Sequence, residues 1–151
     1  MQIDRVELEP RTLLGVHERV KMADLTEYFG RAFTTSAAAL AEQGLAPAGP
    51  PLALYHGMPT DTVDVTAGFP IAGPAHGTSD VVVTELPAGD AITGIYTGPY
   101  DGMTRTYDEI AAWLQEHNLT PGTDMWEEYL SDPETDPDPA TWRTRIVFPL
   151  A

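Results

Sequence analysis

Residues 118–133 read NLTPGTDMWEEYLSDP, and residues 44–59, which precede them by 74 positions, read GLAPAGPPLALYHGMP. Aligned at this offset, the two stretches share a leucine, two prolines and a tyrosine. The identical pairs are Leu45 and Leu119, Pro47 and Pro121, Tyr55 and Tyr129, and Pro59 and Pro133. Gly44 and Asn118 also coincide, and glycine and asparagine are the residues that most commonly end a helix. The sequence therefore contains an internal repeat.

The surroundings of the two stretches repeat as well. A helix with a periodic apolar stripe is predicted before each stretch, over residues 23–43 and 103–117. A strand-like run precedes each helix, and another follows each repeated stretch. These runs cover residues 12–20 and 91–100 before the helices and 63–71 and 142–150 after the stretches, while runs over 2–8 and 80–86 lead into the two halves.

This pattern predicts an α+β fold of two strand–helix–strand–strand modules, with antiparallel sheets and pseudo-two-fold symmetry. One helix covers only one face of its sheet, so the modules are expected to pair and to leave a ligand groove between them. No long linker separates the two halves, about 1–75 and 78–151. Residues 1–151 are therefore predicted to form a single domain.

Composition limits the classes of function. Hydrophobic residues make up 42% of the 151 residues, which indicates a globular chain, and the absence of cysteine excludes disulfides, thiolate metal sites and cysteine nucleophiles. The sequence shows no secretory signal and no apolar run long enough to cross a bilayer, so a cytoplasmic location is expected. The net charge of −15 repels nucleic acids and anionic lipids and attracts cations. We expect neither nucleic acid nor membrane as a direct partner.

Two adjacent acids lie in the second stretch, which is predicted to be extended. In a strand, alternate side chains share a face, so Glu127 and Tyr129 point one way and Trp126 and Glu128 the other. We expect Glu127 to point into the protein and Glu128 to face solvent. Trp126 is expected to pack under a helix.

The repeat is imperfect at these positions. Glu127 aligns with Ala53 and Trp126 with Leu52, so the second half carries a carboxylate and an indole where the first half is apolar. An ionised buried carboxylate is costly without a partner. Either an arginine or a tyrosine hydroxyl of the fold satisfies Glu127, or a ligand supplies the missing charge.

Aromatic residues are the candidates for the groove walls. Tyr129 and its repeat partner Tyr55 suit planar apolar ligands and cations, although core packing accounts equally well for each of them. Tyr96 and Tyr100 flank a Gly-Pro pair where a strand ends, and one of them is expected to line the groove. Phe29, on the first helix, either closes the groove or packs in the core.

The remaining polar motifs indicate no cofactor and no metal. The four histidines, His17, His56, His76 and His117, are scattered without the spacing of metal ligands. The acids of residues 132–138 alternate as in a calcium loop, but prolines interrupt them and the central glycine of that motif is missing. No phosphate-binding loop or nucleophile elbow is present.

The whole chain resembles the GyrI-like family, the bacterial effector-binding domain found in gyrase-inhibitor-like proteins and in drug-sensing modules of AraC-type and MerR-type regulators. Several motifs of the second half carry the likeness, while the first half matches by pattern. These motifs are YTGPY at 96–100, the helix from Tyr107 through Trp113 and Leu114, WEEYLSDP at 126–133, and Thr144, Ile146, Pro149 and Leu150.

The resemblance implies two modules around a central groove, with Glu127 as the buried charge that recognises cationic, lipophilic ligands. It also implies three alternatives for the function. The first is binding of a hydrophobic, cationic or electrophilic small molecule for sensing or sequestration. The second is hydrolysis of cyclopropane-containing genotoxins, with Glu127 as the residue that activates water and a tyrosine hydroxyl as the proton donor to the leaving group. The third is a protein-interaction module of the gyrase-inhibitor type. The sequence leaves these alternatives open.

Overall fold

The computed structural model describes residues 2–57, 60–99, 102–131 and 137–151. Within these residues, two α-helices and eight strands follow the predicted order, with two short 3-10 helices between them. The helices are η1 (Met22–Asp24), α1 (Leu25–Glu42), α2 (Met103–Glu116) and η3 (Pro139–Thr141). The strands are β1 (Ile3–Leu8), β2 (Arg11–Lys21), β3 (Leu52–His56), β4 (Thr62–Ile71), β5 (Val82–Leu86), β6 (Gly89–Thr97), β7 (Asp124–Tyr129) and β8 (Arg143–Pro149).

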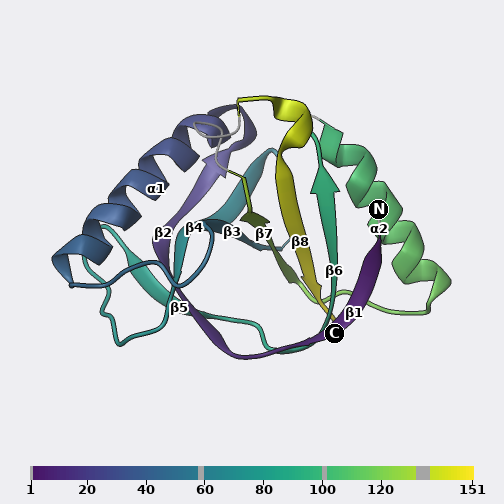
Figure 1. Ribbon diagram of the computed structural model, residues 1–151, viewed down its shortest axis with the longest axis horizontal. Helices are drawn as coiled ribbons and strands as arrows, with labels where there is room; N and C mark the ends of the chain where they lie inside the picture. Colours follow the sequence, from purple (N-terminus) through teal and green to yellow (C-terminus); the bar gives the residue numbers. More distant parts are fainter. Residues whose placement is uncertain (1, 58–59, 100–101, 132–136) are drawn as a thin grey trace.

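The strands form one curled antiparallel sheet in the order β1-β6-β8-β7-β3-β4-β2-β5. The order is symmetric about the β7–β3 pair, and α1 and α2 lie on either side of these central strands (Figure 1). Each half lends its first strand to the other, because β1 pairs with β6 and β5 pairs with β2. The predicted duplication and pseudo-two-fold symmetry are thus confirmed.

The residues that end the helices adopt the same backbone geometry in both halves. Gly44 and Asn118 have positive φ angles of 69° and 54°. The next residues, Leu45 and Leu119, each donate a backbone N–H over 2.9 Å to a carbonyl in the last turn of the helix. This is the Schellman arrangement, which satisfies carbonyls that the helix end leaves free.

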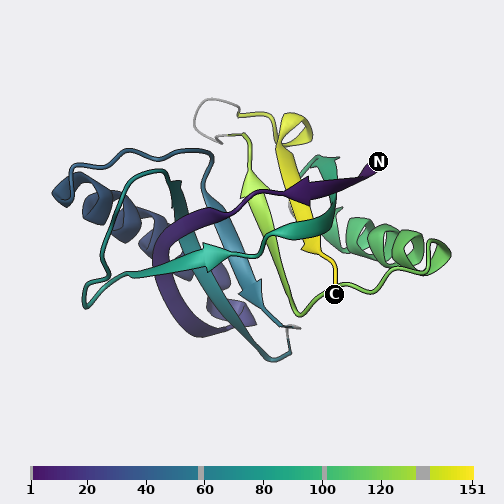
Figure 2. The ribbon, with the colours of Figure 1, turned by 90° about the horizontal axis from the view of Figure 1, so that it is seen from below.

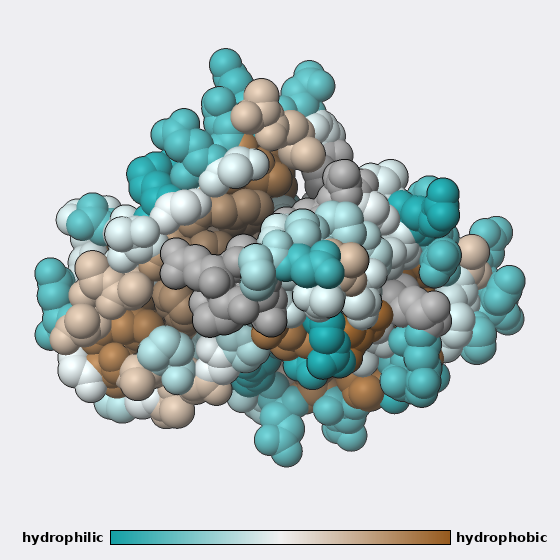
Figure 3. All heavy atoms as spheres, turned by 45° about the horizontal axis from the view of Figure 1, so that its top comes forward, coloured by the Kyte–Doolittle hydropathy of each residue, from teal (hydrophilic) through white to brown (hydrophobic). Residues whose placement is uncertain are grey.

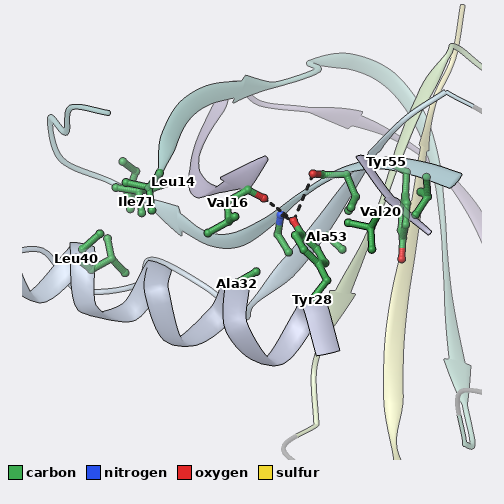
Figure 4. Close-up of a cluster of buried hydrophobic side chains, with 14 residues drawn as sticks. Leu14, Val16, Val20, Tyr28, Ala32, Leu40, Ala53, Tyr55 and Ile71 are labelled. Atoms are coloured by element: carbon green, nitrogen blue, oxygen red, sulfur yellow. Dashed lines mark hydrogen bonds between the residues drawn. The ribbon is translucent and has the colours of Figure 1, made fainter. Parts of the chain in front are cut away.

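The helix α1 packs directly against β2 and β4. Tyr28 points from α1 toward the strands (Figure 4), where its buried hydroxyl donates to the Val16 carbonyl and accepts the Ala67 N–H over 3.0 Å. The strands β2 and β4 approach closely at Gly15 and Gly68. A Cβ atom on Gly68 would lie 2.0 Å from the Leu14 carbonyl oxygen, so this crossing requires glycine.

The other face of the sheet is covered by strands rather than by a helix. β1 and β5 cross the underside of the sheet (Figure 2). A second core lies beneath them, in which Trp126, 1% exposed, packs with Leu52, Leu54 and Leu86. The expectation that Trp126 packs under a helix is therefore wrong, because the strands exchanged between the halves cover this face.

The expectation that Glu128 faces solvent is also wrong. Glu128 shares the Trp126 face and is only 3% exposed. The guanidinium groups of Arg11 and Arg145 each donate to one of its carboxylate oxygens over 2.7 Å, and the Trp126 indole N–H donates over 3.2 Å. Arg11 begins β2 in the other half of the molecule, and Arg145 lies on the neighbouring strand β8, so the two partners come from both halves.

Among the described residues, no helix has both the length and the apolar character needed to cross a membrane.

Two glycine substitutions should change the free energy of unfolding in opposite directions. Gly44→Ala places a side chain at a positive φ and is expected to destabilise the fold by about 1 kcal/mol. Gly30 lies inside α1 with open space around it, so Gly30→Ala should stabilise the fold by roughly 0.5–1 kcal/mol. Urea unfolding of both variants measures this. Equal effects at the two sites would contradict the assigned helix end.

Candidate functional site

The carboxylate of Glu127 lies where the two halves of the sheet meet. β7 pairs with β3 so that Glu127 stands opposite Ala53, which is its own counterpart in the repeat. The pseudo-two-fold axis therefore passes beside this pair. The Glu127 side chain points, with Tyr55 and Tyr129, to the face of the sheet that carries the helices.

Three tyrosine hydroxyls donate to the Glu127 carboxylate, which is 8% exposed. Tyr129 donates to Oε1 over 2.9 Å and Tyr55 approaches the same oxygen at 3.5 Å, while Tyr107 of α2 donates to Oε2. The donors come from β7, β3 and α2, so both halves of the molecule hold this one side chain.

None of the described basic side chains forms a salt bridge with Glu127. Burial raises the pKa of its carboxyl group, and the three tyrosine hydrogen bonds offset only part of this effect. Burial, together with the nearby carboxylate, also raises the pKa values of Tyr55, Tyr107 and Tyr129, so these hydroxyls are neutral donors. The site thus holds a buried acid without a compensating cation.

The neighbouring Glu128 has the opposite electrostatics. Burial would raise the pKa of its carboxyl group, but the hydrogen bonds from Arg11, Trp126 and Arg145 outweigh burial and lower it. Two consecutive glutamates on opposite faces of β7 therefore differ in one respect. Glu128 is paired with two arginines, whereas Glu127 receives hydrogen bonds from tyrosine hydroxyls and forms no salt bridge with the residues that the structure describes.

Glu127 lines a groove with a volume of about 1640 Å³. Its walls are mostly apolar and come from both halves. The lining residues include Leu25, Phe29, Phe33, Tyr55 and Val63 from the first half, and Met103, Tyr107, Ile110, Leu114, Met125, Tyr129 and Phe148 from the second. In Figure 3, hydrophobic surface is set back near the middle of the molecule and hydrophilic residues project around it.

Aromatic rings line the groove beside the carboxylate. Phe29 and Phe33 stack with their ring centroids 6.0 Å apart, and both present edge contacts to Tyr129 at 6.2 and 6.1 Å. On the other side, Tyr107 contacts Phe148 at 6.2 Å. Aromatic faces near a carboxylate form a surface that suits an apolar cation.

The residues predicted for the site divide into three groups. Glu127, Tyr129, Tyr55 and Phe29 are brought together at the groove. Tyr96 is turned away from it, because its hydroxyl donates to the Pro99 carbonyl over 2.7 Å. Tyr100 lies outside the described residues.

Tyr107 was not singled out as a site residue by the sequence analysis, although it donates directly to Glu127. At the offset of the repeat it aligns with Phe33. The second half thus carries a hydroxyl where the first half carries a plain ring, which is the same asymmetry that singles out Glu127 against Ala53. Applied to the helix, that comparison would have indicated Tyr107.

Comparison with solved structures shows the same fold in several proteins. The C-terminal domain of EcmrR matches with a TM-score of 0.84 and 19% identity, over 99% of this chain and 97% of that chain. In a cryo-EM structure of an EcmrR–DNA complex the match has a TM-score of 0.82 and 20% identity, and this chain, matched over 99%, spans only 57% of the EcmrR chain.

Two further structures are similar at low identity. SAV2435 bound to tetraphenylphosphonium matches with a TM-score of 0.73 and 13% identity, over 100% of this chain and 94% of that chain. A hydrolase from Listeria innocua matches with a TM-score of 0.70 and 17% identity, over 99% and 92%. No protein of curated function matches the sequence.

The family comparison covers the whole chain. Residues 1–151 match the model described as the GyrI-like small molecule binding domain. The resemblance carried by the second-half motifs is thereby confirmed, and the fold agrees with it. The chain belongs to the GyrI-like family of small-molecule binding domains.

Proposed function

We propose that this protein binds hydrophobic, cationic small molecules in the groove, with Glu127 as the counter-ion. One observation carries the proposal. The carboxylate is buried at the junction of the two halves, and only neutral tyrosine hydroxyls of the described residues donate to it. A monovalent organic cation supplies the charge that the fold leaves out.

The energetics favour a ligand that is both apolar and charged. Contact between the groove walls and an apolar ligand removes apolar surface from water, which contributes roughly 25 cal/mol of binding free energy per Å². A cation within the groove lies close to Glu127 and to the faces of Tyr55 and Tyr129, where low solvent access strengthens the attraction. A neutral ligand gains only the first contribution, and a small hydrated cation gains only the second.

The relatives support this class of ligand. SAV2435 is a protein of the same fold that was solved with tetraphenylphosphonium, a bulky apolar cation. EcmrR joins a domain of this fold to a longer chain that binds DNA, which favours a sensing role for such domains. For this chain we propose sensing or sequestration of a toxic compound.

A second candidate function is hydrolysis of a strained electrophile such as a cyclopropane. The observation in its favour is the combination of a carboxylate with raised pKa and adjacent tyrosine hydroxyls, an arrangement compatible with general acid–base catalysis. A protein of the same fold is called a hydrolase. In this reaction Glu127 would orient and deprotonate water, and a tyrosine would protonate the leaving carbon.

Removing the charge of Glu127 should weaken cation binding. We expect Glu127→Gln, which keeps the shape of the side chain, to lower the affinity for tetraphenylphosphonium by about 30- to 100-fold, or roughly 2–3 kcal/mol. Isothermal titration calorimetry measures the change. Glu109→Gln, on the exposed surface of α2, makes the same change in net charge and should leave the affinity unchanged.

A neutral ligand completes this comparison. Triphenylphosphine oxide presents three of the four phenyl rings without the positive charge, so wild type and Glu127→Gln should bind it equally. Equal loss of affinity for both ligands would indicate damage to the groove. Equal binding of tetraphenylphosphonium by the two proteins would reject Glu127 as the counter-ion.

Turnover separates the two candidate functions. Under the binding function, incubation with a cyclopropane-containing alkylating agent gives no hydrolysis product above the uncatalysed background, as followed by mass spectrometry. A product that forms with wild type and is lost in Glu127→Gln would establish the hydrolase instead. The loss expected for a general base is about 100-fold or more.

A further inference from the structure

A second polar cluster lies on the opposite face of the sheet from the groove. His17 of β2, His56 of β3 and Asp64 of β4 each offer one ligand atom, and these atoms all lie within 4.8 Å of one another. The strands β3, β4 and β2 are consecutive neighbours in the sheet. We propose that these three side chains form a binding site for a divalent transition-metal ion of the Zn²⁺ class.

The distances between the ligand atoms of the cluster are close to those in a metal site. His17 Nε2 lies 2.5 Å from Asp64 Oδ1, and the rings of His17 and His56 meet edge to face with centroids 5.1 Å apart. Around a tetrahedral Zn²⁺ with bonds of about 2.0–2.1 Å, ligand atoms lie roughly 3.4 Å apart. The three ligand atoms of the cluster lie between 2.5 Å and 4.8 Å apart, a range that includes this value. Side-chain rotations therefore suffice to bring them to the distances of a metal site.

The composition of the cluster selects the kind of metal. Two imidazoles with one carboxylate suit Zn²⁺, Ni²⁺, Co²⁺ and Cu²⁺, whereas Mg²⁺ and Ca²⁺ prefer sets of oxygen ligands. Three protein ligands leave a coordination position for water. His17 is 46% exposed, so an ion reaches the site from solvent.

The surroundings favour a cation. Asp124 stands opposite His56 in the β3–β7 pairing and therefore shares its face, which adds a second carboxylate near the site. The chain as a whole carries a net charge of −15. Two described side chains compete with an ion. The Thr66 hydroxyl lies 2.9 Å from His56 Nε2, so a metal bound through this nitrogen replaces that hydrogen bond. Arg19 lies 3.8 Å from the second oxygen of Asp64, but Arg19 is 64% exposed and a bound ion displaces it into solvent.

The location gives the ion a structural consequence. His56 follows Tyr55 and Asp64 follows Val63, and both of these neighbours line the groove on the other face. A bound metal would therefore cross-link three strands directly behind one wall of the ligand groove. Sequence spacing gives no sign of this site, because the fold brings together residues separated by up to 47 positions.

Titration of the protein with Zn²⁺ tests the site. The chain is purified without a polyhistidine tag, stripped with a chelator and titrated calorimetrically. We expect saturation at one ion per chain, and a melting temperature raised by roughly 5–10 °C at a hundredfold excess over the dissociation constant. Co²⁺ as a substitute should give the visible absorption bands of a histidine-ligated ion, and Mg²⁺ should give no effect.

Two histidine variants locate the ion. His17→Ala removes an exposed ligand without disturbing the core and should weaken Zn²⁺ binding by at least about tenfold. His76→Ala removes an exposed histidine outside the cluster and should bind as wild type does. Zn²⁺ binding that does not saturate at one ion per chain, or that is unchanged in His17→Ala, would overturn the proposal. Either result would leave the assignment of the ligand groove untouched.

Discussion

The pairing of β3 with β7 joins the two halves of the sheet and positions the groove. In that pairing Ala53 stands opposite Glu127, and the two are counterparts in the internal repeat. A residue at this position is equally close to both modules, so a single carboxylate receives hydrogen bonds from Tyr55 of one half and Tyr107 of the other. The two modules are symmetric, but only the second carries a carboxylate at the axis that relates them. The molecule therefore has one such site rather than two.

Glu127 and Glu128 show how the same side chain acquires different roles from its surroundings. Glu128 is enclosed by Arg11, Arg145 and Trp126, and this paired carboxylate joins strands from both halves in the second core. Glu127 is also buried, but its donors among the described residues are tyrosine hydroxyls, so burial dominates its pKa. A group of this kind costs stability in the free protein, and under the proposed function this cost is offset when a cation enters the groove.

The local features of the fold could be predicted from the sequence, and the non-local ones could not. Gly44 and Asn118 mark the helix ends because positive φ is a property of single residues, and alternation along β7 places Glu127 on the groove side. The environments of Trp126 and Glu128 were predicted wrongly because they depend on other strands. Trp126 is covered by the strands β1 and β5 that the halves exchange, and Glu128 is paired with Arg11 of β2 and Arg145 of β8. The amino-acid pattern within one strand carries no information about which other strands lie against it.

The central claim is that a bound cation compensates the buried charge of Glu127, and proton release tests it most directly. Because the pKa of the free carboxyl is raised above its ordinary value of 4.5 and a nearby cation lowers it, binding expels the proton wherever the free acid is protonated. Calorimetry of tetraphenylphosphonium binding in buffers of different ionisation enthalpy, from about pH 5 to pH 8, counts these protons. The account predicts that affinity rises with pH through the pKa of the free acid, with proton release below it that disappears in Glu127→Gln. Binding without proton release at every pH, or release unchanged in Glu127→Gln, would contradict it.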